Sequence, residues 1–202
     1  MTTPPDGLPD WHTLYDQQRG DTLPWHYPAL DPDLEAALAI HGPATGRFLD
    51  LGTGVGAQAI ELAVRHYDVT GIDISTAAIS QAIERAAAHG ADVNFVADDV
   101  LAPRIGGQFD AVFDRGCFHV IDPASRPVYV ASVAAWLAPG ALLYLKCFSH
   151  LQPGTSGPHR FTPDQLRDTF AAAFDLLSAT DALYQGNLET LPRALFCVLR
   201  RR

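Results

Sequence analysis

The chain has 202 residues, of which 48% are hydrophobic and 18% are charged. This length and composition are typical of one globular domain rather than of a disordered protein. With 14 Lys and Arg against 23 Asp and Glu, the formal net charge is -9. That acidic balance argues against nucleic acid or an anionic membrane surface as a partner, because both attract clustered cations.

The first 45 residues differ from the rest of the chain because they are rich in proline and in aromatic residues, among them Trp11, Tyr15 and Trp25. A helix is expected over about residues 33–40. Asp31 or Asp33 would cap it, since a short polar side chain satisfies the free amides at a helix start. We interpret residues 1–45 as an N-terminal cap or lid segment and residues 46–202 as the main domain.

From residue 47 onward, short apolar runs alternate with Ala-rich amphipathic stretches. This alternation predicts an α/β fold, a doubly wound and mostly parallel sheet that helices cover on both faces. Strands are expected at residues 47–52, 68–73, 93–97, 108–114, 141–148, 174–180 and 194–200. Helices are expected at residues 55–65, 75–89, 124–137 and 163–173.

A glycine-rich turn follows the first of these strands, in the run Asp50-Leu-Gly52-Thr-Gly54-Val-Gly56. Glycines at such a turn let a ligand approach the backbone closely. Asp73 ends the second strand, 21 residues after Gly52. A carboxylate there can accept hydrogen bonds from both hydroxyls of a ribose. The pattern therefore predicts a cofactor that contains a nucleoside.

The same glycines also satisfy the dinucleotide pattern G-x-G-x-x-G/A, so an NAD-dependent oxidoreductase is an alternative. Two acids favour a cationic nucleoside instead. Asp50 stands where a carboxylate suits an ammonium group better than a pyrophosphate. Asp99 ends the third strand, where it could accept a hydrogen bond from an adenine amino group, and we expect Asp98 to point away to solvent. S-adenosylmethionine, with its ammonium and sulfonium groups, fits these acids.

With these motifs the sequence resembles the class I S-adenosylmethionine-dependent methyltransferases over nearly all of residues 11–202. It looks most similar to the thiopurine S-methyltransferase-like group of small-molecule methyltransferases. The specific matches are Asp114-Arg115-Gly116 after the fourth strand, Pro24-Trp25, and Gly157-Pro158 followed by Phe161-x-Pro163. The resemblance implies a Rossmann-like sheet of seven strands in a single domain, with the last strand antiparallel.

The resemblance also implies where the ligands bind. Residues expected at the cofactor are Trp25, Asp50, Gly52, Gly54, Gly56, Asp73, Ile74, Asp99, Val100, Asp114, Arg115 and Gly116. Independently of the resemblance, we expect Trp11, Tyr15 and Trp25 to close over the site, although Trp11 and Tyr15 could merely pack the N-terminal segment on the core. Trp11, Tyr15 and His119 are expected at the methyl acceptor.

Two of these residues are candidates for a catalytic role. His119 is the nearest base for an amine or hydroxyl acceptor, although it could instead be structural. Arg115 could fix an anionic acceptor through its fork of donors, or it could form an ion pair with Asp114. Cys117 is interpreted as a small hydrophobic residue rather than as a nucleophile.

We therefore expect an enzyme that transfers a methyl group from S-adenosylmethionine to a sulfur, nitrogen or oxygen atom of a small aromatic or heterocyclic molecule. A thiol is favoured because a thiolate reacts with little help. Besides the oxidoreductase, the alternative from a different class is a non-catalytic regulator that binds the cofactor.

The sequence also carries expectations about location and assembly. The first ten residues have no positive charge and no apolar run, and no stretch reaches the ~18 apolar residues of a transmembrane helix. Cys117, Cys147 and Cys197 form no C-x-x-C pair, and the histidines lack ligand spacing, so no metal site is expected. A cytoplasmic monomer or homodimer is expected.

Overall fold

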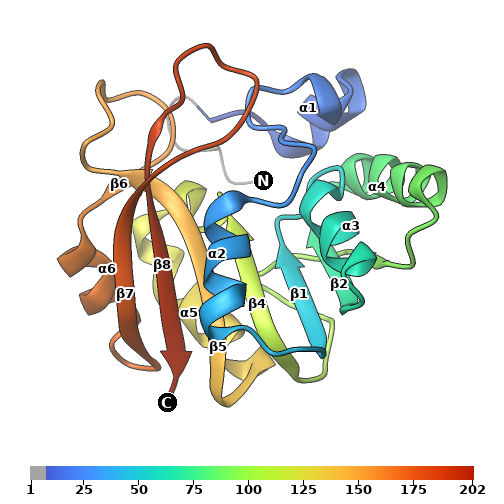
Figure 1. The fold of residues 1–202 in the computed structure, drawn as a ribbon. Coiled ribbons are helices and arrows are strands. Elements are labelled where there is room, and N and C mark those ends of the chain that lie inside the picture. Colours follow the sequence, from blue (N-terminus) through green and yellow to red (C-terminus); the bar gives the residue numbers. More distant parts are fainter. Residues whose placement is uncertain (1–7) are drawn as a thin grey trace.

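The computed structural model describes residues 8–202 and confirms the expected α/β fold, a single domain built around one sheet (Figure 1). The strand order is β3-β2-β1-β4-β5-β8-β7. The first five strands pair in parallel, whereas β8 is antiparallel to both β5 and β7. The strands are β1 (Arg47–Leu51), β2 (Asp68–Asp73), β3 (Asn94–Ala97), β4 (Phe109–Arg115), β5 (Leu137–Ser149), β7 (Phe174–Leu183) and β8 (Arg193–Arg201).

The sheet has one more strand than the expected seven, because β6 (Arg160–Phe161) pairs with the end of β5. A strand of two residues is too short to produce an alternating pattern, which is why the sequence did not reveal it. The hydrogen bond from the His150 amide to the Phe161 carbonyl closes the loop between β5 and β6.

The expected helices are all present, and α1 and three short 3-10 turns are additional. The helices are α1 (Trp11–Gln17), α2 (Pro32–His41), α3 (Ala57–Val64), α4 (Thr76–His89), α5 (Arg126–Trp136) and α6 (Pro163–Phe170). The turns are η1 (Gly20–Thr22), η2 (Phe118–Val120) and η3 (Pro123–Ser125). Within the described part of the chain, no helix is long and apolar enough to cross a membrane.

Helices cover both faces of the sheet. On one face, Leu34 of α2 and Leu62 of α3 pack with Phe113 of β4 in one apolar cluster. On the other face, Tyr129 of α5 and Phe170 of α6 belong to a second, larger cluster. In Figure 1, α2 accordingly lies in front of the sheet and α5 behind it. The core therefore consists of two layers of side chains separated by the sheet.

Asp31 caps α2, one of the two residues expected to do so. Its Oδ1 accepts a hydrogen bond from the Asp33 amide at 3.1 Å. Unlike an ordinary surface cap, the Asp31 side chain is fully buried, because Lys146 of β5 donates to both of its carboxylate oxygens at 2.8 and 2.7 Å. The start of α2 is thus tied to the middle of the sheet.

Candidate functional site

A cavity of about 600 Å³ lies at the carboxyl ends of the parallel strands, beneath α1 and the segment that follows it. This is where ligands bind in open α/β sheets. The structure brings most of the expected site residues together around this cavity: Trp11, Tyr15, Trp25, Asp50, Gly52, Gly54, Asp73, Ile74, Asp99, Val100, Arg115, Gly116 and His119. Gly56 and Asp114 were expected there and do not line it.

The turn after β1 needs glycine at two positions that face the cavity. Gly52 and Gly54 have φ angles of 70° and 54°, which residues with a Cβ rarely adopt. A Cβ on Gly52 would lie 2.9 Å from Cβ of Cys117, and a Cβ on Gly54 would lie 2.9 Å from the Tyr15 hydroxyl. The turn can therefore run close beneath α1 without closing the cavity.

Gly56 has a different reason to be glycine. Its φ angle is 76°, it caps α3, and a Cβ there would lie 2.6 Å from the Phe95 ring of β3. The residue therefore allows α3 to begin close to the sheet. Gly56 was expected beneath the ligand; it does not line the cavity, and the close approach of Phe95 accounts for glycine here.

Two buried carboxylates stand at the ends of β1 and β2. Asp50 accepts a hydrogen bond from the Thr53 hydroxyl at 2.5 Å, and burial raises the pKa of Asp50 to about 6. Asp73 accepts from the amides of Gly54 and Ser75, both at 2.9 Å, and burial also raises its pKa. Burial disfavours the charged form of both groups, so a bound cation or a pair of hydroxyl donors would stabilise them strongly.

The two acids that follow β3 differ from expectation in one respect. Asp98 was expected to point to solvent, but its side chain is only 1% exposed. Its carboxylate accepts from the amides of Arg104 and Ile105, so it holds the loop after β3 together. Asp99 remains half-buried and accepts from the Leu101 amide at 2.8 Å. Loop geometry, which strand alternation does not predict, decides the orientation of Asp98.

Asp114 is fully buried and faces away from the cavity. Its carboxylate accepts from the amides of Cys117 at 2.8 Å and Phe118 at 2.9 Å, and from the Tyr129 hydroxyl. Burial raises the pKa of Asp114 to about 7. Asp114 was expected beside the ligand; it does not line the cavity, and its carboxylate fixes the turn between β4 and η2.

Arg115 lines the cavity, but its donors already have partners. Nε donates to the Asp31 carboxylate at 2.8 Å, Nη1 to the Trp25 carbonyl at 3.0 Å, and Nη2 to the Gln185 carbonyl at 2.5 Å. Its guanidinium also lies 4.5 Å from the centre of the Tyr184 ring. Arg115 therefore pairs with Asp31 and not with Asp114, the partner considered as an alternative to a role at the acceptor. Arg115 joins the N-terminal segment and the β7–β8 connection to the end of β4.

His119 is buried at the cavity wall, and its Nδ1 accepts a hydrogen bond from the Phe148 amide at 3.2 Å. Burial, assisted by the positive charge of Arg115, lowers the pKa of His119 to about 3. An imidazole whose Nδ1 accepts a hydrogen bond carries its proton on Nε2. His119 therefore lines the cavity with a protonated Nε2, whereas the general base considered as one of its two roles would need an unprotonated nitrogen there.

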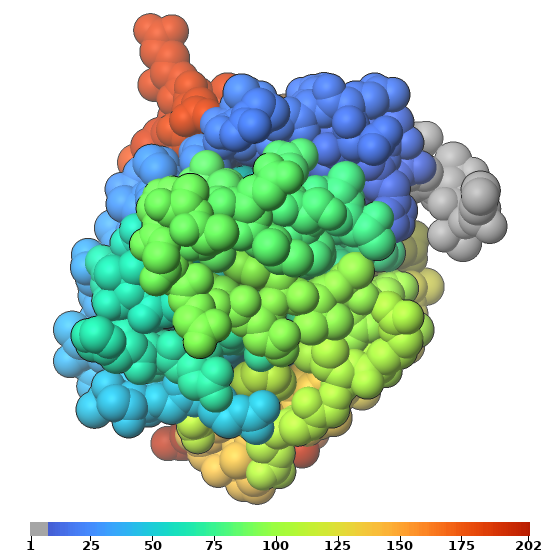
Figure 2. All heavy atoms as spheres, turned by 90° about the vertical axis from the view of Figure 1, so that its right-hand side faces the viewer, coloured from blue at the N-terminus to red at the C-terminus, as the bar shows by residue number. Residues whose placement is uncertain are grey.

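The N-terminal segment covers the cavity through an aromatic cluster. The rings of Trp11 and Trp25 meet edge to face with centroids 5.9 Å apart, and Trp25 Nε1 donates to the Tyr15 hydroxyl at 3.4 Å. Gln81 of α4 holds this segment by bonding the Gly20 amide and the carbonyls of Tyr15 and Gln18. Figure 2 shows the blue N-terminal segment resting along the green surface of α4.

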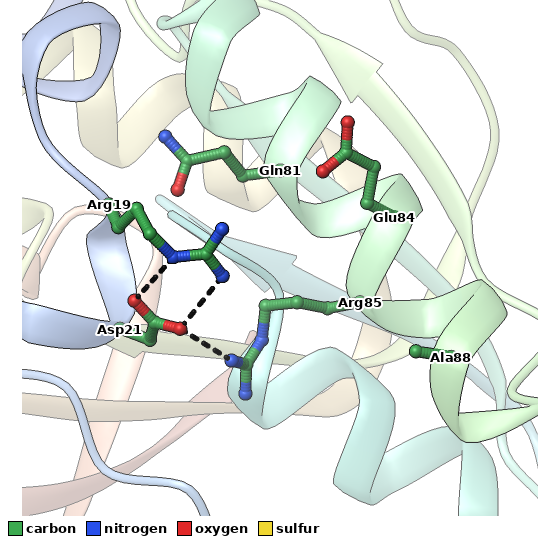
Figure 3. Close-up of a pocket in the computed structure, with 6 residues that line it drawn as sticks. All are labelled: Arg19, Asp21, Gln81, Glu84, Arg85 and Ala88. Carbon is green, nitrogen blue, oxygen red and sulfur yellow. Dashed lines mark hydrogen bonds and ion pairs between the residues drawn. The ribbon is translucent and has the colours of Figure 1, made fainter.

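A second, smaller pocket of about 150 Å³ marks the same contact between η1 and α4. Asp21 pairs there with Arg19 at 3.0 Å and with Arg85 at 3.8 Å, as Figure 3 shows. Because the pair of Asp21 with Arg85 joins η1 to α4, this pocket belongs to the attachment of the N-terminal segment.

Sequence reasoning missed several residues of the site. Tyr184, between β7 and β8, lines the cavity and donates through its hydroxyl to the Arg115 carbonyl at 2.7 Å. Gln58 of α3 bonds the Tyr27 and Ala29 carbonyls and the Asp31 amide, and so fixes the approach to α2. Lys146 could have been recognised from the sequence, since a lysine inside an apolar strand requires a buried acidic partner.

The chain is similar in sequence to known methyltransferases. The model of the methyltransferase domain matches residues 48–140. An uncharacterized methyltransferase of Schizosaccharomyces pombe is 37% identical over 102 residues, which are 50% of this chain and 70% of the relative. The chain belongs to the methyltransferase family. It is a class I S-adenosylmethionine-dependent methyltransferase, as its sequence motifs predict.

Further relatives and a solved structure extend the match. The 2-heptyl-1-hydroxyquinolin-4(1H)-one methyltransferase of Mycobacteroides abscessus is 32% identical over 149 residues, covering 72% of this chain and 65% of the relative. A thiopurine S-methyltransferase of Legionella pneumophila is 25% identical over 196 residues, covering 88% of this chain and 87% of the relative. A structure reported for the conversion of a disulfide bond into a thioacetal group during echinomycin biosynthesis has a TM-score of 0.81 at 26% identity, covering 94% of this methyltransferase and 92% of that chain.

Proposed function

We propose that this methyltransferase acts on a small aromatic or heterocyclic molecule, at a sulfur, nitrogen or oxygen atom, with a thiol favoured. The observation that carries the proposal is the division of the cavity into two ends. At one end stand carboxylates: Asp50 and Asp73 lie at the ends of β1 and β2, and Asp98 and Asp99 follow β3. Around the ends of β4 and β5 the lining is mostly apolar and aromatic, with Phe148, Ile121, Pro158 and Tyr184.

The residues at the acidic end fit S-adenosylmethionine. Asp50 would pair with the ammonium group and Asp73 with the ribose hydroxyls, because both carboxylates are buried and lack a cationic partner among the described residues. Gly52 and Gly54 would let the ligand lie against the backbone, and Asp99, Ile74 and Val100 would surround the adenine. The cofactor supplies a methyl group already activated on a sulfonium, so the chain's task is to bind, orient and exclude water.

The N-terminal segment, in its described residues 8–45, would act as the cover of this site. Trp11, Tyr15 and Trp25 face the cavity from above, and their rings can exclude water and stabilise a sulfonium by about 0.5–2 kcal/mol each. Arg115 would act as a positioning residue, since it holds the Trp25 backbone and the Asp31 side chain in place.

The names of two relatives support a ring-shaped acceptor. One is named for a hydroxyquinolone and the other for thiopurines, so both names describe nitrogen-containing ring systems. Only the second name states the atom that receives the methyl group, which is sulfur. The apolar end of the cavity in this chain suits such a ring, and the comparison leaves the choice of atom to experiment.

Calorimetric titration with S-adenosylhomocysteine, with NAD in parallel, tests the cofactor end. We expect micromolar binding of the first and none of the second. Asp73→Asn should weaken binding by about 1.5–3 kcal/mol, the range for hydrogen bonds to a charged group. Asp68→Asn is the matched control, because Asp68 begins the same strand and its side chain is 75% exposed. Equal affinity of the Asp73 variant and wild type would refute the ribose assignment.

Turnover separates an enzyme from a regulator that only binds the cofactor. The enzyme is incubated with S-adenosylmethionine and with aromatic thiols, phenols or heterocyclic amines in turn. We expect release of S-adenosylhomocysteine with at least one of these three classes of acceptor. Binding of the cofactor without turnover on any of these three classes would favour the regulator.

A further inference from the structure

Among the described residues, the carboxylates that line the cavity are all at one end of it. Asp50 and Asp73 lie at the ends of β1 and β2, and Asp98 and Asp99 follow β3, whereas the ends of β4 and β5 contribute no carboxylate to the lining. A neutral amine or alcohol that attacks a methyl group must lose a proton, and that proton needs an acceptor nearby. Because the acids stand at the other end of the cavity, an acceptor that must lose a proton has no carboxylate beside it among the described residues.

The imidazole of His119 is fixed in one tautomer by its surroundings. Nδ1 accepts from the Phe148 amide at 3.2 Å, and the His119 carbonyl accepts from the His159 amide at 2.8 Å. The ring packs edge-on against Phe148 with centroids 4.9 Å apart and stacks on Tyr184 at 5.7 Å. With Nδ1 occupied, the proton sits on Nε2, which has no acceptor among the described residues.

The position of Nε2 is defined by Gly116. A Cβ at Gly116 would lie 3.1 Å from His119 Nε2 and 2.2 Å from the Tyr184 hydroxyl. The absence of a Cβ at Gly116 therefore lets the Tyr184 hydroxyl and the His119 ring pack against its backbone, and all three residues line the cavity. A ligand atom that approaches His119 Nε2 from the cavity would meet an N–H and not a lone pair.

The charged and titratable groups around His119 keep it a donor. Arg115 of β4 and His159 of the loop before β6 both oppose a positive charge on the ring, and burial lowers its pKa to about 3. The Tyr184 hydroxyl donates to the Arg115 carbonyl, and burial raises its pKa, so it keeps its own proton and does not serve as a base. The local charge is that of the Arg115 guanidinium, whose Nε pairs with Asp31.

We propose that His119 is a specificity-determining residue that selects the methyl acceptor as an anion, by donating the Nε2–H hydrogen bond to it. This inference rests on the proposed function and narrows its substrate class to small aromatic molecules that ionise near neutral pH, such as aromatic thiols and acidic ring hydroxyls. The lone pair of the anion forms the bond to the methyl carbon, and the C–S bond of the sulfonium breaks with its electrons passing to sulfur. Anion and cation become two neutral products, so the site needs no base.

Absorbance of 4-nitrothiophenol, whose thiol and thiolate differ in colour, tests this selection without turnover. The protein is saturated with S-adenosylhomocysteine, the thiol is added, and the pH is varied across the pKa of the free thiol. We expect the bound pKa to be lower than the free one by at least one unit, which means at least tenfold tighter binding of the anion.

Two substitutions at His119 distinguish the effect of its Nε2–H donor from the effect of the shape of its ring. His119→Asn keeps an oxygen that can accept from the Phe148 amide but removes the donor, and it should weaken anion binding about 10- to 100-fold. His119→Gln places an amide N–H near the position of Nε2 and should recover most of that loss. His150→Asn, an exposed histidine just after β5, is the control and should leave anion binding unchanged.

Several outcomes would overturn the proposal. One is equal binding of thiol and thiolate, and another is no binding of either form while calorimetry still shows the cofactor product bound. Equal loss in the Asn and Gln variants would reduce His119 to a packing role. His26 also lines the cavity, and a pH profile that moves in His26→Asn would reveal a base there. Loss of S-adenosylhomocysteine binding itself would instead count against the proposed function.

Discussion

Asp114 and Arg115 are neighbours in the sequence, yet their side chains leave β4 on opposite faces, as strand alternation requires. Asp114 is enclosed by two backbone amides and the Tyr129 hydroxyl, while Arg115 reaches the N-terminal segment. A motif predicts that such residues stand near a ligand. It does not predict which of them faces the ligand and which holds the turn that presents it.

The raised pKa of Asp114 has a consequence for stability. Its pKa of about 7 lies above the ordinary value of 3.8, so the folded protein keeps this proton between about pH 4 and pH 7 while the unfolded chain has lost it. Stability should therefore fall as the pH rises through that window, by at most about 1.4 kcal/mol per pH unit. Asp50, with a pKa of about 6, acts in the same direction.

Asp114→Asn removes one of these two titrations. Urea unfolding between pH 4.5 and pH 8 should show a smaller fall in the free energy of unfolding for the variant than for wild type. Asp110→Asn, at the exposed start of the same strand, should follow the wild-type curve. If the curves of Asp114→Asn and wild type ran parallel, the carboxyl would be charged throughout, and its burial would be compensated in some other way.

At the scale of elements, length decides what the sequence can predict. The strands from β1 to β5 and the helices α3 to α5 carry long apolar patterns, and their positions follow from these patterns. By contrast, β6 has two residues, and α1 has seven residues of which Tyr15 alone is buried. Such elements exist because of tertiary contacts, such as the bonds from Gln81 to the α1 region, that no local pattern contains.

Gln81 offers a test of how the N-terminal segment is held. Gln81→Ala removes three hydrogen bonds to Tyr15, Gln18 and Gly20, while the packing of α4 on the sheet remains. We expect faster amide exchange in α1 and η1, severalfold weaker binding of S-adenosylhomocysteine, and a melting temperature within a few degrees of wild type. Ser80→Ala, on the exposed side of the same helix, is the control. Unchanged exchange in α1 would show that the aromatic cluster alone holds the segment.

At the scale of the whole molecule, the two ends of the cavity differ in how far they could be predicted. Asp50, Asp73 and Asp99 each stand at or just after the end of a parallel strand, and parallel strands end at one edge, so the sequence predicts that these acids meet. Tyr184 and Gln185 reach the same edge only because β7 and β8 form an antiparallel pair beside β5. Their approach to Arg115 depends on that pairing, which no spacing in the sequence encodes.

A buried group of charges connects the N-terminal segment to the centre of the sheet. Lys146 of β5 donates to Asp31 and, at 2.6 Å, to Asp33, and Arg115 of β4 donates to Asp31. Two bases and two acids balance, and the side chains of Lys146 and Asp31 are fully buried. Removing one partner from such a group leaves a buried charge without compensation, which typically costs about 3–5 kcal/mol.

Lys146→Met should therefore lower the free energy of unfolding by about 3–5 kcal/mol in urea titrations, although the methionine fills most of the space. Arg167→Met, which breaks the exposed pair with Asp164, removes the same charge and should change stability by no more than about 1 kcal/mol. Adding Asp31→Asn to Lys146→Met should recover part of the loss, because the uncompensated carboxylate is then absent. The contrary outcome is a double variant whose loss of unfolding free energy equals the sum of the losses in Lys146→Met and Asp31→Asn. It would show that Lys146 and Asp31 stabilise the fold independently. The N-terminal segment would then be held by its other contacts.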